Sequence, residues 1–270
     1  MRNGGIMGHR LYIVEGLPCT GKSTAAEYIA QLLRGQGKTV HCFDEGCGDH
    51  PADYEFHSFI TEADFAEFTQ AQQEKLSEIS EKRCGGYVVP LSQCGELFDA
   101  LIRYKIYDML AWETERPIML DKWRRFIEEA DSDAVYVFNC CFLQNPMCET
   151  MMRFGFTKEQ SAEYIAEIAH IIAPFKPVVI YLQNSDIAEC VRKTATEREG
   201  WLDAVIDYHN SGAYGRSINA HGFEGYIACL EERQRRELEI LSQISVESHV
   251  ISEPQRDRKA ASAEIKRVIA

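Results

Sequence analysis

Eight consecutive residues near the start of the chain combine two glycines, a lysine and a serine at a spacing that can hold phosphate. They are Gly16, Leu17, Pro18, Cys19, Thr20, Gly21, Lys22 and Ser23. They fit G-x-x-x-x-G-K-[ST], the phosphate-binding P-loop, in which glycines let successive backbone N–H groups point at phosphate oxygens. Lys22 is expected on the β- and γ-phosphates, Ser23 on Mg²⁺ through its hydroxyl, and Thr24 near the α-phosphate. The sequence therefore predicts ATP and Mg²⁺ as cofactors, bound by these residues, with Ser23 as the metal ligand.

The segments around this motif have the periodicity needed to position it. The apolar run 11–14 predicts a strand over 10–15, and apolar residues at helical spacing predict a helix that reaches about residue 34. Further apolar or β-branched runs predict strands at 39–43, 134–138, 178–182 and 249–251, with helices between them. The fold class is therefore expected to be α/β, a three-layer sandwich around a five-stranded parallel sheet.

Two acids, Asp44 and Glu45, directly follow the second predicted strand. Ligands of open α/β sheets bind beyond the carboxyl ends of the strands. Because the P-loop motif lies at the same end of the first strand, we expect these carboxylates to face the phosphates held there.

Two long segments are expected to build the acceptor side of the site. The stretch from about 61 to 130 is interpreted as a helical insertion, in which Asp121 is either a Walker B-type acid or a solvated helix residue. The stretch from about 186 to 222 is interpreted as a lid or loop region. In the following charged helix, Arg233, Arg235 and Arg236 alternate with glutamates, which predicts a salt-bridged surface face.

Composition limits the classes of function. The chain has 270 residues and a net charge of −13, which argues against a general affinity for nucleic acid. No apolar run approaches the length of a membrane span. Residues 1–9 are interpreted as a flexible leader, and the ten scattered cysteines favour a cytoplasmic protein with reduced thiols. Zinc bound by Cys42, Cys47, His50 and His57 is an alternative that their spacing does not favour.

The combination of these features resembles a known family. Five strands alternating with helices, a P-loop motif after the first strand and arginines after the fourth are similar to the P-loop kinases of the nucleoside and nucleotide kinase group, with a thymidylate kinase-like layout. The best-matched parts are residues 10–46 and 175–270. The resemblance implies the P-loop NTPase fold, a single kinase-like domain over 10–270 and the strand order 2-3-1-4-5.

The resemblance also implies roles for individual residues. Asp44 or Glu45 would face the acceptor, either accepting a proton from its hydroxyl or binding it, and Lys22 with the lid residues Arg192 and Arg198 would neutralise the transferring phosphoryl group. Surface ion pairs are the alternative for both arginines. The loop at 252–256 would border the adenine. The family often has an acid and an arginine at the end of the third strand, where this chain has Asn139 followed by Cys140, so Gln144 and Asn145 are considered as acceptor contacts instead.

The sequence therefore predicts an ATP-dependent phosphotransferase whose partners are ATP and a small-molecule acceptor, a nucleoside- or nucleotide-like one being favoured. One alternative is a kinase of another small hydroxylated compound. A second is a nucleotide-binding regulatory protein with little transfer activity, and a third, a kinase of nucleic acid ends, is disfavoured by the acidic charge. The sequence is compatible with a homodimer and gives no membrane partner.

Overall fold

The computed structural model describes residues 8–198 and 200–270. Most of the expected leader lies outside these ranges. The chain divides into two compact units, where the sequence analysis expected a single domain with an insertion. One unit runs to Glu45 and resumes at Ala130, and the other comprises Gly46 to Glu129.

The first unit is built on a five-stranded parallel sheet. From edge to edge its strands are β2 (Thr39–Phe43), β6 (Ala134–Asn139), β1 (Leu11–Gly16), β7 (Val178–Gln183) and β8 (Glu247–Ser252). In whole-chain numbering this order differs from the expected 2-3-1-4-5, because the expectation counted five strands and missed three that form a separate sheet. When only the five strands of this sheet are numbered along the chain, their order from edge to edge is 2-3-1-4-5.

The strand register brings three strand ends to one edge of the sheet. Val14 of β1 lies opposite Asn139 of β6, and Phe43 of β2 lies opposite Phe138. Because parallel strands present their carboxyl ends at the same edge, the residues that follow β1 and β2 meet the end of β6 there. These segments are the ones that carry Gly16, Asp44 and Asn139.

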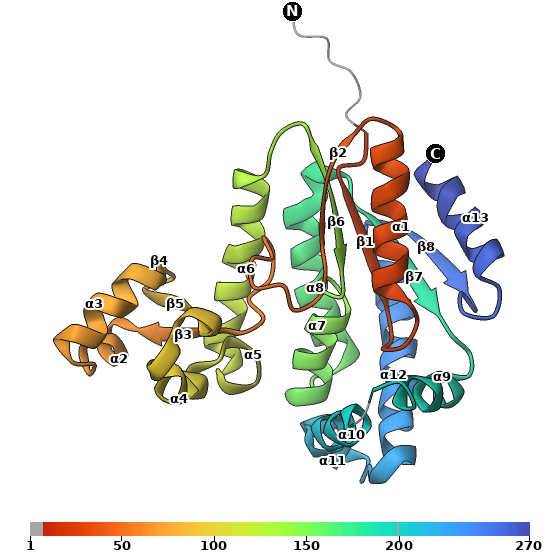
Figure 1. Cartoon of the computed structure of the whole chain (residues 1–270). Coiled ribbons are helices and arrows are strands. Elements are labelled where there is room, and N and C mark those ends of the chain that lie inside the picture. The colour runs from red at the N-terminus through yellow and green to blue at the C-terminus, as the bar shows by residue number, and fades with distance from the viewer. Residues whose placement is uncertain (1–7, 199) are drawn as a thin grey trace, which may run out of the picture. The chain divides into compact units, whose positions relative to one another are not determined.

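Helices cover both faces of this sheet (Figure 1). The helical elements of this unit are α1 (Lys22–Gly35), α7 (Gln144–Met147), a π-helical turn η4 (Cys148–Arg153), α8 (Lys158–Ile172), the 3₁₀ turn η5 (Ala173–Phe175), α9 (Ile187–Ala195), α10 (Trp201–Ser211), α11 (Ala213–Ser217), α12 (Gly222–Gln243) and α13 (Arg258–Ile269). Figure 1 shows α1 and α13 on one face and α8 and α12 on the other. The three-layer arrangement follows from the central strands β6, β1 and β7, which are buried almost throughout and need a helical layer over each face.

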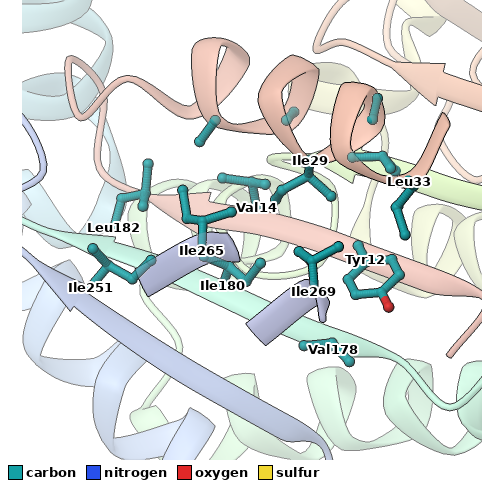
Figure 2. Close-up of a cluster of buried hydrophobic side chains, with 14 of the residues drawn as sticks. Tyr12, Val14, Ile29, Leu33, Val178, Ile180, Leu182, Ile251, Ile265 and Ile269 are labelled. Carbon is teal, nitrogen blue, oxygen red and sulfur yellow. The ribbon is translucent and has the colours of Figure 1, made fainter. Parts of the chain in front are cut away.

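The main core lies between the sheet and the pair α1 and α13. Figure 2 shows Val14 and Ile180 of the sheet packed with Ile29 of α1 and Ile265 of α13. All four side chains are buried, which fixes α1 over the strand that precedes it.

Most of the stretch expected to be a lid or loop is helical, because it holds α10 and α11. Leu202, Val205 and Ile206 recur at helical spacing and pack in the cluster that holds Ile187 of α9 and Tyr226 of α12. This apolar face explains why α10 forms within a stretch for which the sequence analysis expected a lid or loop.

The second unit combines a small antiparallel sheet with short helices. Its strands are β3 (His57–Thr61), β5 (Gly86–Pro90) and β4 (Glu81–Arg83), and its helical elements are α2 (Glu62–Ala66), α3 (Gln70–Ile79), η1 (Leu91–Gln93), η2 (Gly95–Leu97), α4 (Phe98–Leu101), η3 (Ile102–Tyr104), α5 (Ile106–Met109) and α6 (Trp112–Glu129). The insertion, expected to be mainly helical with a short extended stretch at 87–91, also contains this sheet: Ile60 and Val89, on strands, share a buried core with Leu76 of α3. Asp121 lies on α6 and not at the end of a strand.

None of the helices that the structure describes is long and apolar enough to cross a lipid bilayer. All ten cysteines lie in the described ranges, and all are free.

Candidate functional site

The glycine-rich loop leaves β1 through backbone conformations that need glycine. Gly16 has φ +136°, and a Cβ there would lie 2.4 Å from the backbone oxygen of Leu182. Gly21 has φ +91° and caps the start of α1, where a Cβ would lie 2.2 Å from Nε2 of Gln255. Gly16 is therefore required by space as well as by φ, whereas Gly21 is required mainly by φ because the side chain of Gln255 can move.

Lys22 is the first residue of α1, and its side chain turns back over the loop. Its Nζ donates to the backbone oxygen of Leu17 at 2.8 Å, and the hydroxyl of Thr20 donates to the same oxygen at 2.9 Å. The ammonium group is thus held inside the curve of the loop, beside the N–H groups at the start of α1. The N-terminal end of a helix favours an anion, and the lysine charge adds to this preference.

Asn139, at the end of β6, connects three residues of the candidate site. Its Nδ2 lies 2.8 Å from Oδ1 of Asp44 and 3.4 Å from Oγ of Ser23, and its Oδ1 accepts the backbone N–H of Glu45 at 2.9 Å. The side chain is 1% exposed. The kinases that the sequence resembles often have an acid at this position, where this chain has the amide of Asn139. The carboxylate beside it is Asp44, which follows the neighbouring strand β2.

Glu45 is held from the segment that follows β6. Gln144 donates through Nε2 to Oε1 of Glu45 at 2.6 Å, and Sγ of Cys140 lies 3.2 Å from Oε2. Cys140 has φ +66°, a left-handed conformation that is uncommon for a residue with a side chain. Backbone strain of this kind concentrates at functional sites, where the surrounding structure maintains it.

The same segment is anchored by a buried acid that the sequence analysis did not identify. Glu15, the last residue before Gly16, accepts three backbone N–H groups: Oε1 from Phe142 at 2.8 Å and from Leu143 at 2.9 Å, and Oε2 from Gln144 at 3.1 Å. The side chain is completely buried. Burial raises the pKa of Glu15 to about 7, against the opposing effect of the three N–H groups.

The two lid arginines occupy different surroundings. Arg192 stacks over the ring of Phe223 with its guanidinium carbon 4.7 Å from the ring centre, and its Nη2 lies 3.8 Å from Oε1 of Glu224. This contact is a surface ion pair, the alternative given for this arginine, and it is made with Glu224 rather than with Glu189 or Glu197 in its own segment. Arg198 instead acts electrostatically on Cys19 of the glycine-rich loop, whose thiol pKa is raised by burial and lowered in part by this charge. Of the two, the structure brings Arg198 toward the loop.

Gln255, between β8 and α13, contacts the loop from another side. Its Nε2 donates to the backbone oxygen of Thr20 at 3.0 Å. The segment expected to border the adenine therefore touches the residue before Gly21.

The donor set of the site fits Mg²⁺ better than a tightly held structural metal. No group of three or more His, Cys, Asp and Glu side chains suited to a metal occurs among residues 8–198 and 200–270. Ser23 and Asp44 supply a hydroxyl and a carboxylate on either side of the Asn139 amide. Mg²⁺ prefers such hard oxygen donors and usually completes its shell with water and substrate phosphates.

The sequence analysis missed the buried roles of Glu15 and Arg233, although the sequence contains a signal for each. Glu15 is an acid at the end of an otherwise apolar buried strand, a position where an unpaired carboxylate is costly. Arg233 lies two helical turns after Tyr226, on the buried side of α12, so the expectation of a surface face is wrong for it, while Arg235 and Arg236 do pair with Glu232. Gln144 was named in the sequence analysis as an acceptor contact, and in the structure its side chain binds Glu45.

A scan against protein-family models finds no family that matches this chain, and a search of curated proteins finds no matching relative.

Proposed function

We propose that the chain is an ATP-dependent phosphotransferase with the P-loop NTPase fold, a kinase of a small molecule, with a nucleoside- or nucleotide-like acceptor favoured. The observation that carries the proposal is the position of Lys22. Its buried ammonium group lies within the curve of a glycine-rich loop, at the start of α1 and next to Ser23. A likeness to the nucleoside and nucleotide kinase group, based on the motif and the order of elements, supports the same reading.

Phosphoryl transfer asks for positioning and for neutralisation of charge rather than for covalent chemistry by the protein. In this proposal Lys22 and the loop N–H groups bind the phosphates, and Arg198 approaches the transferring group from the lid. Asp44 is held by Asn139 through Oδ1, and it accepts the proton of the attacking hydroxyl. Glu45, whose two carboxylate oxygens are engaged by Gln144 and Cys140, is assigned to orienting the acceptor.

Ser23 would hold Mg²⁺, which would supply charge neutralisation at the phosphates when it is bound. The amide of Asn139 keeps this hydroxyl and the Asp44 carboxylate in place for their separate roles. A cytoplasmic location, expected from the free thiols, belongs to the same proposal.

The test is ATP-dependent phosphorylation by Lys22→Ala, with Lys38→Ala as the matched control. Lys38 is exposed and follows α1. Loss of a charge contact made mainly in the transition state costs roughly 3 kcal/mol, or about a hundredfold in kcat. We expect this loss in Lys22→Ala and normal turnover in Lys38→Ala, measured as ADP formation with a panel of acceptors. Near-full turnover by Lys22→Ala would contradict the proposal.

A second candidate function is a nucleotide-binding regulatory protein, favoured by the amide at Asn139, where the resembling kinases often have an acid. This reading expects the wild-type chain to bind ATP with Mg²⁺ and to form no more ADP with acceptors than without them. The same ADP assay therefore separates the two functions.

A further inference from the structure

A row of polar side chains lies on the buried side of α12. Tyr226, Arg233 and Glu237 follow one another at intervals of seven and four residues, which places them on one face of a helix. All three are at most 1% exposed. Tyr226 packs in the same cluster as Leu17 of the glycine-rich loop, and the charge of Lys22 acts on Glu237. The row therefore borders the proposed phosphate site.

Part of this row is paired, although the contact between Nε of Arg233 and Oε1 of Glu237 is an ion pair without a hydrogen bond. Nε of Arg233 lies 3.1 Å from Oε1 of Glu237, the hydroxyl of Tyr181 donates to Oε2 of Glu237 at 2.6 Å, and Nη1 of Arg233 lies 3.1 Å from Sγ of Cys148. Cys148 begins the π-helical turn η4. Turns of this kind are rare and occur often at functional sites.

Three other atoms of the same region have no hydrogen-bond partner among the residues that the structure describes. They are Nη2 of Arg233, Oη of Tyr226 and Nε2 of His209 on α10. His209 is 5% exposed, and its ring centre lies 4.9 Å from that of Tyr226. A buried polar atom without a hydrogen-bond partner lowers the free energy of unfolding by about 1–3 kcal/mol. Three such atoms in one region therefore indicate a place where a further group can bind.

The hydrogen-bonding character of these atoms defines what can bind. Nδ1 of His209 lies 2.9 Å from the backbone oxygen of Val205, so it must carry the proton, and Nε2 is an acceptor. Burial and the charge of Arg233 lower the pKa of His209 to about 4, which keeps the ring neutral. Arg233 only donates, and the hydroxyl of Tyr226 does both. A partner must therefore offer a donor and acceptors together.

An ionised phosphate does not meet this requirement. It presents only acceptors, which would face the lone pair of His209, and it would approach Glu237, whose carboxylate already pairs with the guanidinium of Arg233. Sugar hydroxyls and base carbonyls supply both kinds of group without charge.

We infer that Arg233, Tyr226 and His209 form the acceptor subsite of the proposed kinase and select an uncharged, hydroxyl-bearing acceptor of the nucleoside class over its phosphorylated form. The inference rests on the proposed function and narrows it. Tyr226 contacts the acceptor directly through its hydroxyl.

The experiment is calorimetric titration of the full chain with ribonucleosides, 2′-deoxynucleosides and the corresponding 5′-monophosphates, in the presence of Mg²⁺ and a non-hydrolysable ATP analogue. The key variant is Tyr226→Phe, which removes a hydroxyl that has no partner. We expect at least one nucleoside to bind the wild type more tightly than its monophosphate, and Tyr226→Phe to weaken that binding about tenfold or more. The midpoint of unfolding of the unliganded variant should not fall.

The matched control is Tyr136→Phe. Tyr136 is also buried, but its hydroxyl accepts the backbone N–H of Asp131 at 2.9 Å. This variant should lose stability and keep the nucleoside affinity.

Three results would overturn the inference: no nucleoside binds, monophosphates bind more tightly, or Tyr226→Phe binds nucleosides as the wild type does. A drop in the stability of unliganded Tyr226→Phe would also count against it, because an ordered water would then already satisfy these atoms. A separate titration with the ATP analogue alone tests the proposed function, so the two failures are distinguishable.

Discussion

Replacement of Glu15 by glutamine tests how the segment after β6 is held. The carboxylate of Glu15 is completely buried and receives the N–H groups of Phe142, Leu143 and Gln144. Glutamine keeps the shape and one oxygen acceptor but cannot ionise. Its NH₂ group would face one of the N–H donors, so a constant loss of stability is expected, and only the pH dependence of the comparison reports the titration of Glu15.

The expected effect depends on pH, and its sign follows from the pKa. Burial raises the pKa of Glu15 from 4.5 to about 7 in the folded state. A carboxyl group whose folded pKa is raised stabilises the fold below the unfolded pKa, and this contribution is lost as the pH rises through the folded pKa. The free energy of unfolding of the wild type, relative to Glu15→Gln, should therefore fall by about 2.5 kcal/mol between pH 5 and pH 8.

The assay is urea denaturation of both proteins at several pH values in that range. Subtracting the two curves cancels the titration of every other group that is the same in both. A difference that stays constant over this range would show that the pKa of Glu15 is not raised, because a carboxyl group with an ordinary or lowered pKa is already largely ionised above pH 5. Extending the comparison down to about pH 3 would then show whether the three N–H groups lower the pKa, since the difference would rise with pH there.

The remaining predictions concern the loop, the Asn139 amide and the lid. Gly16→Ala should lower the free energy of unfolding by about 2 kcal/mol or more, because an alanine Cβ has no room at this positive φ. Urea denaturation measures this loss, and an unchanged midpoint would contradict the geometry. Asn139→Ala leaves the N–H of Glu45 without its acceptor, so we expect a loss of about 1 kcal/mol in stability and a drop in kcat of about tenfold or more in the acceptor assay. Arg192→Ala should change kcat less than about twofold, since its side chain is 61% exposed and pairs at the surface. Arg198→Ala should lower kcat about tenfold, and equal effects of the two arginine variants would remove the distinction between them.

The fold of the first unit could be predicted because its strands are marked by short-range patterns. The run from Leu11 to Val14 and the β-branched residues of β2 are visible without any tertiary information. The small sheet of the second unit was missed for the opposite reason. β4 has only three residues, and β3 pairs with β5 across an intervening segment that holds α2 and α3.

The candidate site was predictable only where one strand and its loop carry it. The motif gave Lys22 and Ser23, and the position after β2 gave Asp44. The hydrogen bonds of Asn139 to Asp44 and of Glu15 to the segment after β6 join residues about 95 and 127 apart, and no local pattern encodes such pairs. The burial of Arg233 was likewise hidden, because an arginine among glutamates is usually a surface residue.

The place of Glu45 in the chain gives its hydrogen bonds a further meaning. Glu45 is the last residue of the first unit before the polypeptide enters the second. Its side chain is bound by Gln144 and Cys140, and its N–H is bound by Asn139. All of these partners belong to the first unit, so the last residue before the first of the two junctions is fixed from one side only. The position of this carboxylate is therefore encoded within the first unit and does not depend on any residue of the second.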